Sequence, residues 1–337
     1  MDLFLISLAM ILLGLAAYTF WKTRAIARRH SPDGEFRTVD GVKLHFFNVI
    51  ASASAAPRPT LVFVHGASGN ALDQLTAFKD RLEGKYGLLF VDRPGLGHSQ
   101  RDGERHSNPA EQARSIGALL KDLGISDCIV IGHSLGASVT AALALLRPDL
   151  VRGLVFLAPA THPWPGGVNW YYRVAALPVI GPLFCRTITL PVAERVAPVS
   201  ISGVFSPDCA HDGYARDIKL PLLFRPESFR ANAQDVAYLK GHLRRLAEAY
   251  PAIEQPAVVI TGDRDTVVWP SIHSEGLVRD LPNATLVVLE GAGHMPHHTH
   301  GERIAQEIMD FAEMVSAMAE EAGELADGQT LVDVPTN

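Results

Sequence analysis

A serine flanked by two glycines gives the clearest indication of chemistry in this sequence. Gly132-His133-Ser134-Leu135-Gly136 fits the pattern G-x-S-x-G, and it lies directly after the apolar run Cys128–Ile131 and directly before the helical run Ala137–Leu146. A sharp strand-to-helix turn of this kind exposes the serine Oγ, and the N-terminus of the following helix favours a developing anion. The pattern therefore predicts Ser134 as a nucleophile; an ordinary strand-to-helix turn is the alternative.

A serine hydroxyl needs a base to remove its proton, and a histidine on a late loop is expected to supply it. His294 ends the stretch Gly291-Ala292-Gly293-His294, which follows the last apolar run. A metal site is the alternative, because His297, His298 and His300 lie close by. Since the sequence places no cysteine or clustered carboxylate beside them, we predict no metal ligands here and assign these three histidines to a loop or helix start.

The imidazole in turn needs an acid that fixes its tautomer and stabilises its charge. Thr261-Gly262-Asp263-Arg264-Asp265 follows an apolar run and offers two aspartates. Asp265 lies further into the loop, from where it could reach over the sheet edge, so we favour it as the acid and interpret Asp263 as a structural turn residue. The chain order Ser134, Asp265, His294 is the order found with this type of elbow.

An oxyanion intermediate requires two backbone N–H donors. Leu135, directly after the nucleophile, is the first candidate. The second is Ala67, in the glycine-rich loop Val64-His65-Gly66-Ala67-Ser68-Gly69. A phosphate cradle is the alternative interpretation of this loop, but the Lys-Ser/Thr ending of a P-loop is missing.

The elements that must position these residues alternate short apolar runs with helical stretches, which indicates a mostly parallel sheet covered by helices on both faces. A β-hairpin around Asp40-Gly41 precedes them. We predict an α/β core over residues 31–160 and 251–319, a helical cap over 161–250 and an acidic, disordered tail over 320–337. The apolar runs are Thr60–Val64, Leu88–Val91, Cys128–Ile131, Leu154–Leu157, Ala257–Thr261 and Leu286–Leu289.

The cap segment is rich in aromatic residues and would lie over the carboxyl edge of the sheet, where open α/β sheets bind ligands. We predict Trp164, Trp170 and Tyr171 as substrate-binding residues. The alternative is that these side chains form only the interior of the cap.

The N-terminal residues 1–30 are predicted to form a membrane anchor with a basic flank. Leu3–Trp21 contains 19 residues without a charge, about the length that crosses a bilayer as a helix. A cleaved signal peptide is the alternative, but the basic residue that should precede such a segment is replaced by Asp2. Four basic residues follow the run, which predicts a single-pass anchor with the catalytic part on the cytoplasmic side. They are Lys22, Arg24, Arg28 and Arg29.

Composition excludes other classes. A formal net charge of −6 without a basic face argues against a nucleic-acid binder, and 47% hydrophobic residues argue against global disorder. The three cysteines give neither a disulfide framework nor zinc-ligand spacing.

Together these motifs resemble the α/β-hydrolase superfamily, in particular lidded serine hydrolases with a nucleophile elbow and a Ser-Asp-His triad. The resemblance runs from about Phe36 to about Met318 and includes Asp92-Arg93-Pro94-Gly95-Leu96-Gly97-His98-Ser99. It implies that Asp92 braces its loop, and that neither cofactor nor metal is needed. Ser134 departs from the aspartate nucleophile of dehalogenase and epoxide-hydrolase relatives.

We therefore expect a serine hydrolase that cleaves a small ester of a hydrophobic acyl or aryl group. Two alternatives remain. A carbon–carbon-bond hydrolase would use the same triad, and a non-catalytic ligand receptor could share the fold. The expected partners are the ester substrate and membrane lipid.

Overall fold

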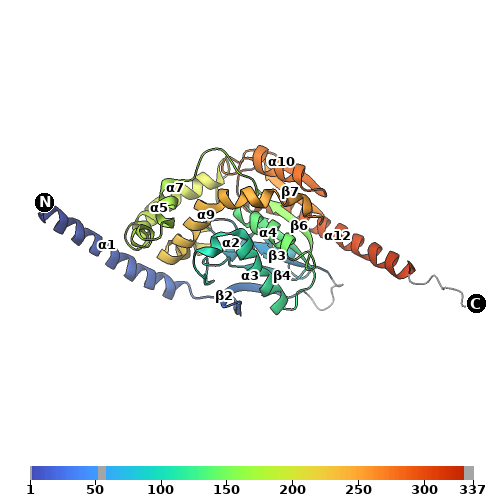
Figure 1. The fold of residues 1–337 in the computed structure, drawn as a ribbon, viewed down its shortest axis with the longest axis horizontal. Helices are drawn as coiled ribbons and strands as arrows, with labels where there is room; N and C mark the ends of the chain where they lie inside the picture. The colour runs from blue at the N-terminus through green and yellow to red at the C-terminus, as the bar shows by residue number, and fades with distance from the viewer. Residues whose placement is uncertain (1, 52–57, 330–337) are drawn as a thin grey trace, which may run out of the picture.

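The computed structural model describes residues 2–51 and 58–329, and an eight-stranded sheet forms the centre of the chain (Figure 1). The strand order is β1-β2-β4-β3-β5-β6-β7-β8. β2 pairs antiparallel with β1 and β4, and every other neighbouring pair is parallel. The predicted fold class, a mostly parallel sheet flanked by helices, is confirmed.

Each predicted apolar run forms a strand. The interior strands are almost entirely buried, as expected for a sheet covered on both faces. Asp40 and Gly41 have φ of 49° and 79°, the positive values that a two-residue hairpin turn requires. The strands are β1 Glu35–Val39, β2 Val42–Val49, β3 Thr60–Val64, β4 Leu88–Val91, β5 Cys128–His133, β6 Val151–Leu157, β7 Ala257–Gly262 and β8 Ala284–Leu289.

Helices cover the two faces and form two separate apolar clusters. One cluster joins the sheet to α3 (Pro109–Asp122), α4 (Leu135–Leu146) and α10 (Pro270–Asp280). The other joins it to α2 (Ala71–Leu82) and α12 (Gly301–Gln329). Alternate residues of one strand enter opposite clusters, so the loops at the strand ends are held from both sides.

α12 extends further than the sequence analysis expected. Residues 320–329 are helical rather than disordered, whereas 330–337 lie outside the described residues. Alanine and glutamate are strong helix formers, and the two glycines of this stretch weaken a helix without ending it.

A series of helices lies between β6 and β7, where the helical cap is predicted, and the bounds of that cap remain a prediction. These elements are α5 Trp170–Ala176, α6 Ile180–Phe184, the π-helical turn η2 Cys185–Thr189, α7 Leu190–Phe205, α8 Tyr214–Asp217, the 3₁₀ turn η3 Leu220–Phe224, α9 Pro226–Ala247 and the 3₁₀ turn η4 Tyr250–Ala252. Two short elements lie outside this segment, the 3₁₀ turn η1 Glu104–Ser107 and α11 Pro296–Thr299.

The apolar N-terminal segment forms one long helix, α1 (Asp2–Arg29), which projects from the body (Figure 1). Only its C-terminal part packs against the protein. Ile26 is buried in an apolar cluster with Leu190 and Ala193, and Lys22 Nζ lies 2.8 Å from a carboxylate oxygen of Glu194. In the described part of the chain, α1 and the stretch Ile180–Phe205 are long and apolar enough to cross a membrane, a test that a signal sequence also passes.

Candidate active site

Ser134 occupies the tight turn between β5 and α4. Its φ of 51° and ψ of −120° form a strained backbone that residues other than glycine rarely adopt. A Cβ at Gly132 would lie 2.8 Å from the Cα of Ala137, and one at Gly136 would lie 2.1 Å from the carbonyl oxygen of Val64. Both glycines of the sequence pattern are therefore required by close approaches of the backbone.

The three predicted triad side chains lie together at the carboxyl edge of the sheet. His294 Nε2 lies 3.0 Å from Ser134 Oγ, and His294 Nδ1 lies 2.7 Å from Asp265 Oδ2. Since a carboxylate only accepts, Nδ1–H donates to Asp265, which leaves Nε2 free to accept the serine proton. Ser134 is 8% exposed, His294 3% and Asp265 4%, so this hydrogen-bonded chain is shielded from water.

The two candidate aspartates have different partners. Asp265 Oδ1 accepts hydrogen bonds from the backbone N–H groups of Val267 and Val268, at 2.8 and 2.9 Å, which fixes the carboxylate that faces His294. Asp263 Oδ1 instead accepts a hydrogen bond from Gly291 N–H at 2.7 Å and joins two loops. Asp265 thus faces His294 and Asp263 does not, while the assignment of Asp265 as the acid stays a prediction.

The glycine-rich loop passes directly beside the elbow. A Cβ at Gly66 would lie 3.1 Å from Ser134 Cβ, so Gly66 lies close to the nucleophile and Ala67 is the next residue of the loop. Leu135 is the first residue of α4 and directly follows Ser134. Burial lowers the pKa of His65 to about 4. The neutral His65 ring accepts a hydrogen bond from Arg93 N–H through Nε2, at 3.0 Å, and donates one to Gly66 O through Nδ1, at 2.8 Å.

Two side chains that the sequence analysis missed hold this loop. The buried Arg93 guanidinium donates to the carbonyl oxygens of His65 and Gly66 at 2.9 and 3.0 Å. Asn232 of α9 makes two hydrogen bonds to Ser68. Its Oδ1 accepts one from Ser68 N–H, and its Nδ2 donates one to Ser68 Oγ. Nothing in the sequence pattern pairs Asn232 with a loop 164 residues away, because only the docking of α9 brings them together.

The predicted substrate-binding aromatics do not form one group. Trp170 and Tyr171 contact each other on α5, with ring centroids 6.1 Å apart, and Trp170 is 66% exposed. Trp164 lies elsewhere, 6.0 Å from the ring of His273 and packed against the core. Tyr172, which follows Tyr171 with ring centroids 4.5 Å apart, is the α5 residue that reaches the loop, with its hydroxyl 3.4 Å from Ser68 Oγ.

The late histidines do meet a carboxylate, so the expectation that none accompanies them was wrong. Asp73 of α2 lies 3.1 Å from His297 Nε2 and 2.9 Å from His298 Nε2, and the hydroxyl of Tyr214 donates to it at 3.0 Å. Burial alone would raise the pKa of Asp73, but the charges and hydrogen bonds of both histidines hold that pKa well below its usual range. Asp73, His297 and His298 could offer ligand atoms to a metal ion, yet the hydrogen bonds of Asp73 to the two histidines already account for the arrangement.

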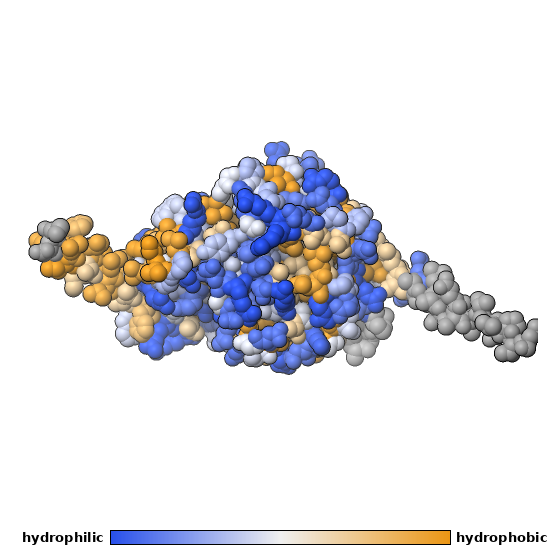
Figure 2. Space-filling model, in the orientation of Figure 1, coloured by the Kyte–Doolittle hydropathy of each residue, from blue (hydrophilic) through white to orange (hydrophobic). Residues whose placement is uncertain are grey.

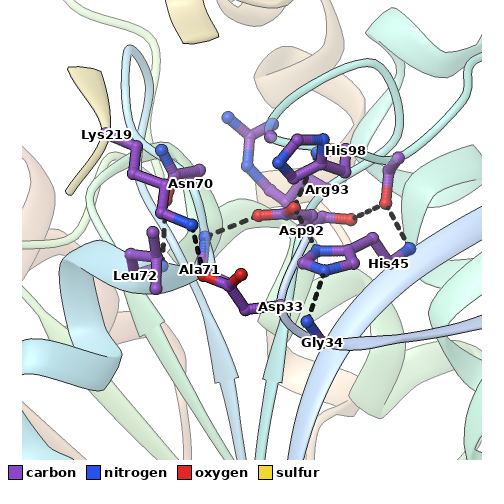
Figure 3. Close-up of polar contacts among 12 residues, drawn as sticks. Asp33, Gly34, His45, Asn70, Ala71, Leu72, Asp92, Arg93, His98 and Lys219 are labelled. Carbon is purple, nitrogen blue, oxygen red and sulfur yellow. Dashed lines mark hydrogen bonds and ion pairs between the residues drawn. The ribbon is translucent and has the colours of Figure 1, made fainter. Parts of the chain in front are cut away.

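Asp92 lies in a second buried network, shown in Figure 3. Its Oδ2 accepts hydrogen bonds from His45 Nδ1–H and His98 N–H at 2.7 and 2.8 Å, and its Oδ1 accepts one from Ala71 N–H at 2.7 Å. These partners belong to β2, to its own loop and to the start of α2. The contacts match the bracing role implied for Asp92 by the resemblance.

Comparison with known proteins agrees with this architecture. The model of the alpha/beta hydrolase family matches residues 61–307, and the chain belongs to this family. The hydrolase YugF of Bacillus subtilis is 25% identical over 280 residues, which cover 81% of this chain and 96% of YugF.

Solved structures share the fold at lower identity. An esterase from Thermogutta terrifontis superimposes with a TM-score of 0.62 at 20% identity, covering 84% of this chain and 99% of that one. A membrane phospholipase A, described as a bacterial virulence factor, has a TM-score of 0.62 at 21% identity and covers 94% of this chain and 99% of its own. The protein is therefore a hydrolase of the α/β-hydrolase family.

Proposed function

We propose that this hydrolase cleaves an ester of a hydrophobic acyl or aryl group through an acyl-enzyme on Ser134. The observation that carries the proposal is the hydrogen-bonded chain from Asp265 through His294 to Ser134, set on a strained elbow. A serine held in this way beside an oriented base is the arrangement of an activated nucleophile.

In this mechanism each residue has one role. Ser134 Oγ attacks the ester carbonyl while His294 Nε2 accepts its proton, and Asp265 stabilises the imidazolium that forms. The backbone N–H groups of Leu135 and Ala67 donate to the oxyanion, and the proton on His294 then passes to the leaving alcohol. Water, activated by the same histidine, attacks the acyl-enzyme, releases the acid and restores Ser134.

The ester assignment is supported by the site and by similar proteins. The aromatic series Trp170, Tyr171, Tyr172 begins at the protein surface and ends at Ser68, next to the proposed oxyanion donor, so an apolar chain could lie along it. Proteins described as an esterase and as a membrane phospholipase A share the fold.

A substrate panel tests this proposal. Purified protein should react with a fluorophosphonate probe at Ser134 and should hydrolyse p-nitrophenyl esters, with kcat/KM rising with acyl length from acetate to at least octanoate, because a longer chain removes more apolar surface from water. Turnover of a vinylogous diketone with no ester hydrolysis would replace the proposal with carbon–carbon-bond hydrolysis. Absence of both probe labelling and turnover would indicate a non-catalytic protein.

We also propose that α1 anchors the protein in a membrane, with the hydrolase on the cytoplasmic side. The N-terminal half of α1 is exposed and apolar, whereas Thr19 and Ile26 are buried against the protein. The helix thus divides into a free apolar part and a part that packs on the cap segment.

Two N-terminal deletions should separate these parts. Removing Asp2–Gly14 should release the protein from membranes after carbonate extraction, with kcat on a soluble ester within a few-fold of the full chain, because the remaining apolar stretch is too short to span. Removing Asp2–Arg29 should in addition lower the melting temperature, since it strips Ile26 from its apolar cluster. A mature N-terminus near Arg28 in protein from the native cell would show that the segment is a cleaved signal instead.

A further inference from the structure

The cap segment exposes an unusual set of large apolar side chains, which we call the cap face. Val199 is 76% exposed, and Val179 between α5 and α6 is 84% exposed. On α7, Val192, Val196 and Val199 follow one another at helical spacing and therefore share one side of the helix. The cap face consists of Trp170, Leu177, Val179, Ile180, Leu183, Val192, Val196 and Val199, all of which are more than 40% exposed.

α7 is apolar on its buried side as well. Leu190, Ala193 and Phe205 are at most 8% exposed. A helix at a protein surface normally carries mostly polar residues on its outer side, whereas α7 exposes Val192, Val196 and Val199 beside Arg195 and Ser200. An exposed apolar side of a surface helix marks a contact with another apolar body.

Charge around the cap face points to the nature of that body. Residues 161–206 contain only four charged side chains, of which three are basic, in a chain with a net charge of −6. The single acidic residue, Glu194, is neutralised by Lys22 of α1. Arg173, Arg186 and Arg195 are all exposed, although Arg186 also lies 3.7 Å from a carboxylate oxygen of Glu227. Exposed basic side chains beside exposed apolar ones suit anionic lipid headgroups above a hydrocarbon layer.

The cap face is continuous with α1. The hydroxyl of Tyr18 and the ammonium of Lys22 both bind Glu194 on α7, at the end of the uncharged run where a bilayer surface would lie. In Figure 2 the hydrophobic surface of α1 continues onto the adjoining part of the body, where Figure 1 places α5.

We propose that the cap face rests in the interfacial layer of the same lipid bilayer that α1 spans. This inference rests on the proposed anchoring by α1. The stretch Ile180–Phe205 lies on the membrane rather than across it, because Leu190 and Ala193 on its inner side are buried in an apolar cluster with other parts of the protein.

The position of α5 gives this contact a consequence for catalysis. Trp170 belongs to the cap face, and Tyr172, less than one helical turn away, lies beside Ser68 in the proposed oxyanion loop. A substrate that follows α5 therefore passes from the bilayer to Ser134. The substrate class is an ester that resides in the membrane, with its acyl chain among the lipids.

Depth-dependent quenching in proteoliposomes tests the contact without using activity. In full-length protein carrying Cys209→Ser, which removes the exposed native cysteine, an NBD label is placed at Val199→Cys or, as a control, at Val288→Cys of β8, which replaces another exposed valine. Phosphatidylcholine–phosphatidylglycerol vesicles with 5-doxyl lipid should quench the label at 199 at least threefold more strongly than the label at 288. Equal, water-like emission at both positions would overturn the proposal, as would disulfide formation between two copies through unlabelled Val199→Cys.

A kinetic comparison tests the consequence. Val196→Asp/Val199→Asp should lower kcat/KM on a long-chain ester in vesicles at least tenfold and leave kcat/KM on soluble p-nitrophenyl butyrate within twofold, with Val288→Asp neutral on both. An equal loss on both substrates would show that the cap face acts on folding rather than on membrane contact. If no ester is cleaved, the proposed function fails, whereas the quenching result still decides the membrane contact.

Discussion

Replacing Ser134 with alanine should lower kcat for ester hydrolysis by roughly 10⁴-fold or more, with little change in folding. The hydroxyl is the proposed nucleophile, and removing any member of a triad disables the unit because its members act together. Stability should hold because the substitution removes one hydrogen bond, from Ser134 Oγ to His294 Nε2 at 3.0 Å, while alanine keeps the Cβ of the elbow. Steady-state hydrolysis of the best ester of the panel, together with thermal melting, measures both effects.

Ser274→Ala is the matched control for this experiment. Ser274 lies in α10, is 1% exposed, and its Oγ has no hydrogen-bond partner among the described residues, so its loss should leave kcat unchanged. If Ser134→Ala kept more than a tenth of the hydrolysis rate, Ser134 would have to be removed from the mechanism. If Ser134→Ala loses labelling by a fluorophosphonate and Ser274→Ala keeps it, the reactive hydroxyl is located at Ser134 independently of turnover.

Asp265→Asn should lower kcat by about 10⁴-fold, the loss that follows when an amide holds the catalytic imidazole in the wrong tautomer. The carboxylate lies 2.7 Å from His294 Nδ1 and is fixed from the other side by two backbone N–H donors. An asparagine has one oxygen, so it cannot accept hydrogen bonds from both the backbone donors and Nδ1–H, and its amide nitrogen would face one of these groups. The pre-steady-state burst of acyl-enzyme should disappear together with the turnover.

Asp263→Asn provides the comparison. Asp263 Oδ1 accepts a hydrogen bond from Gly291 N–H, 28 residues further along the chain. Asparagine keeps an oxygen that can accept this hydrogen bond, so the substitution should reduce kcat by less than about tenfold. The reverse ranking of the two variants would transfer the acid role to Asp263.

Much of the framework of this site could be predicted from short stretches of sequence. The hairpin at Asp40-Gly41 and the strands that end in the elbow and the acid loop follow from local patterns, because alternation, apolar runs and turn glycines act over a few neighbouring residues. The elbow belongs to this group, since the glycines that Ser134 requires are its near neighbours in the chain.

The tertiary structure decided the contacts between distant segments. Asp73 meets His297 across 224 residues and Asn232 meets Ser68 across 164, and neither pairing has a local signal. The burial of Ile26 against the cap helices also has no local signal, because the N-terminal run predicts only a membrane helix. Nor does local sequence show that one side of α7 is exposed, since an apolar side of a helix is usually buried. Periodicity specifies which side of an element is apolar, but only the packing of remote elements determines whether that side meets the core, a neighbouring helix or a membrane.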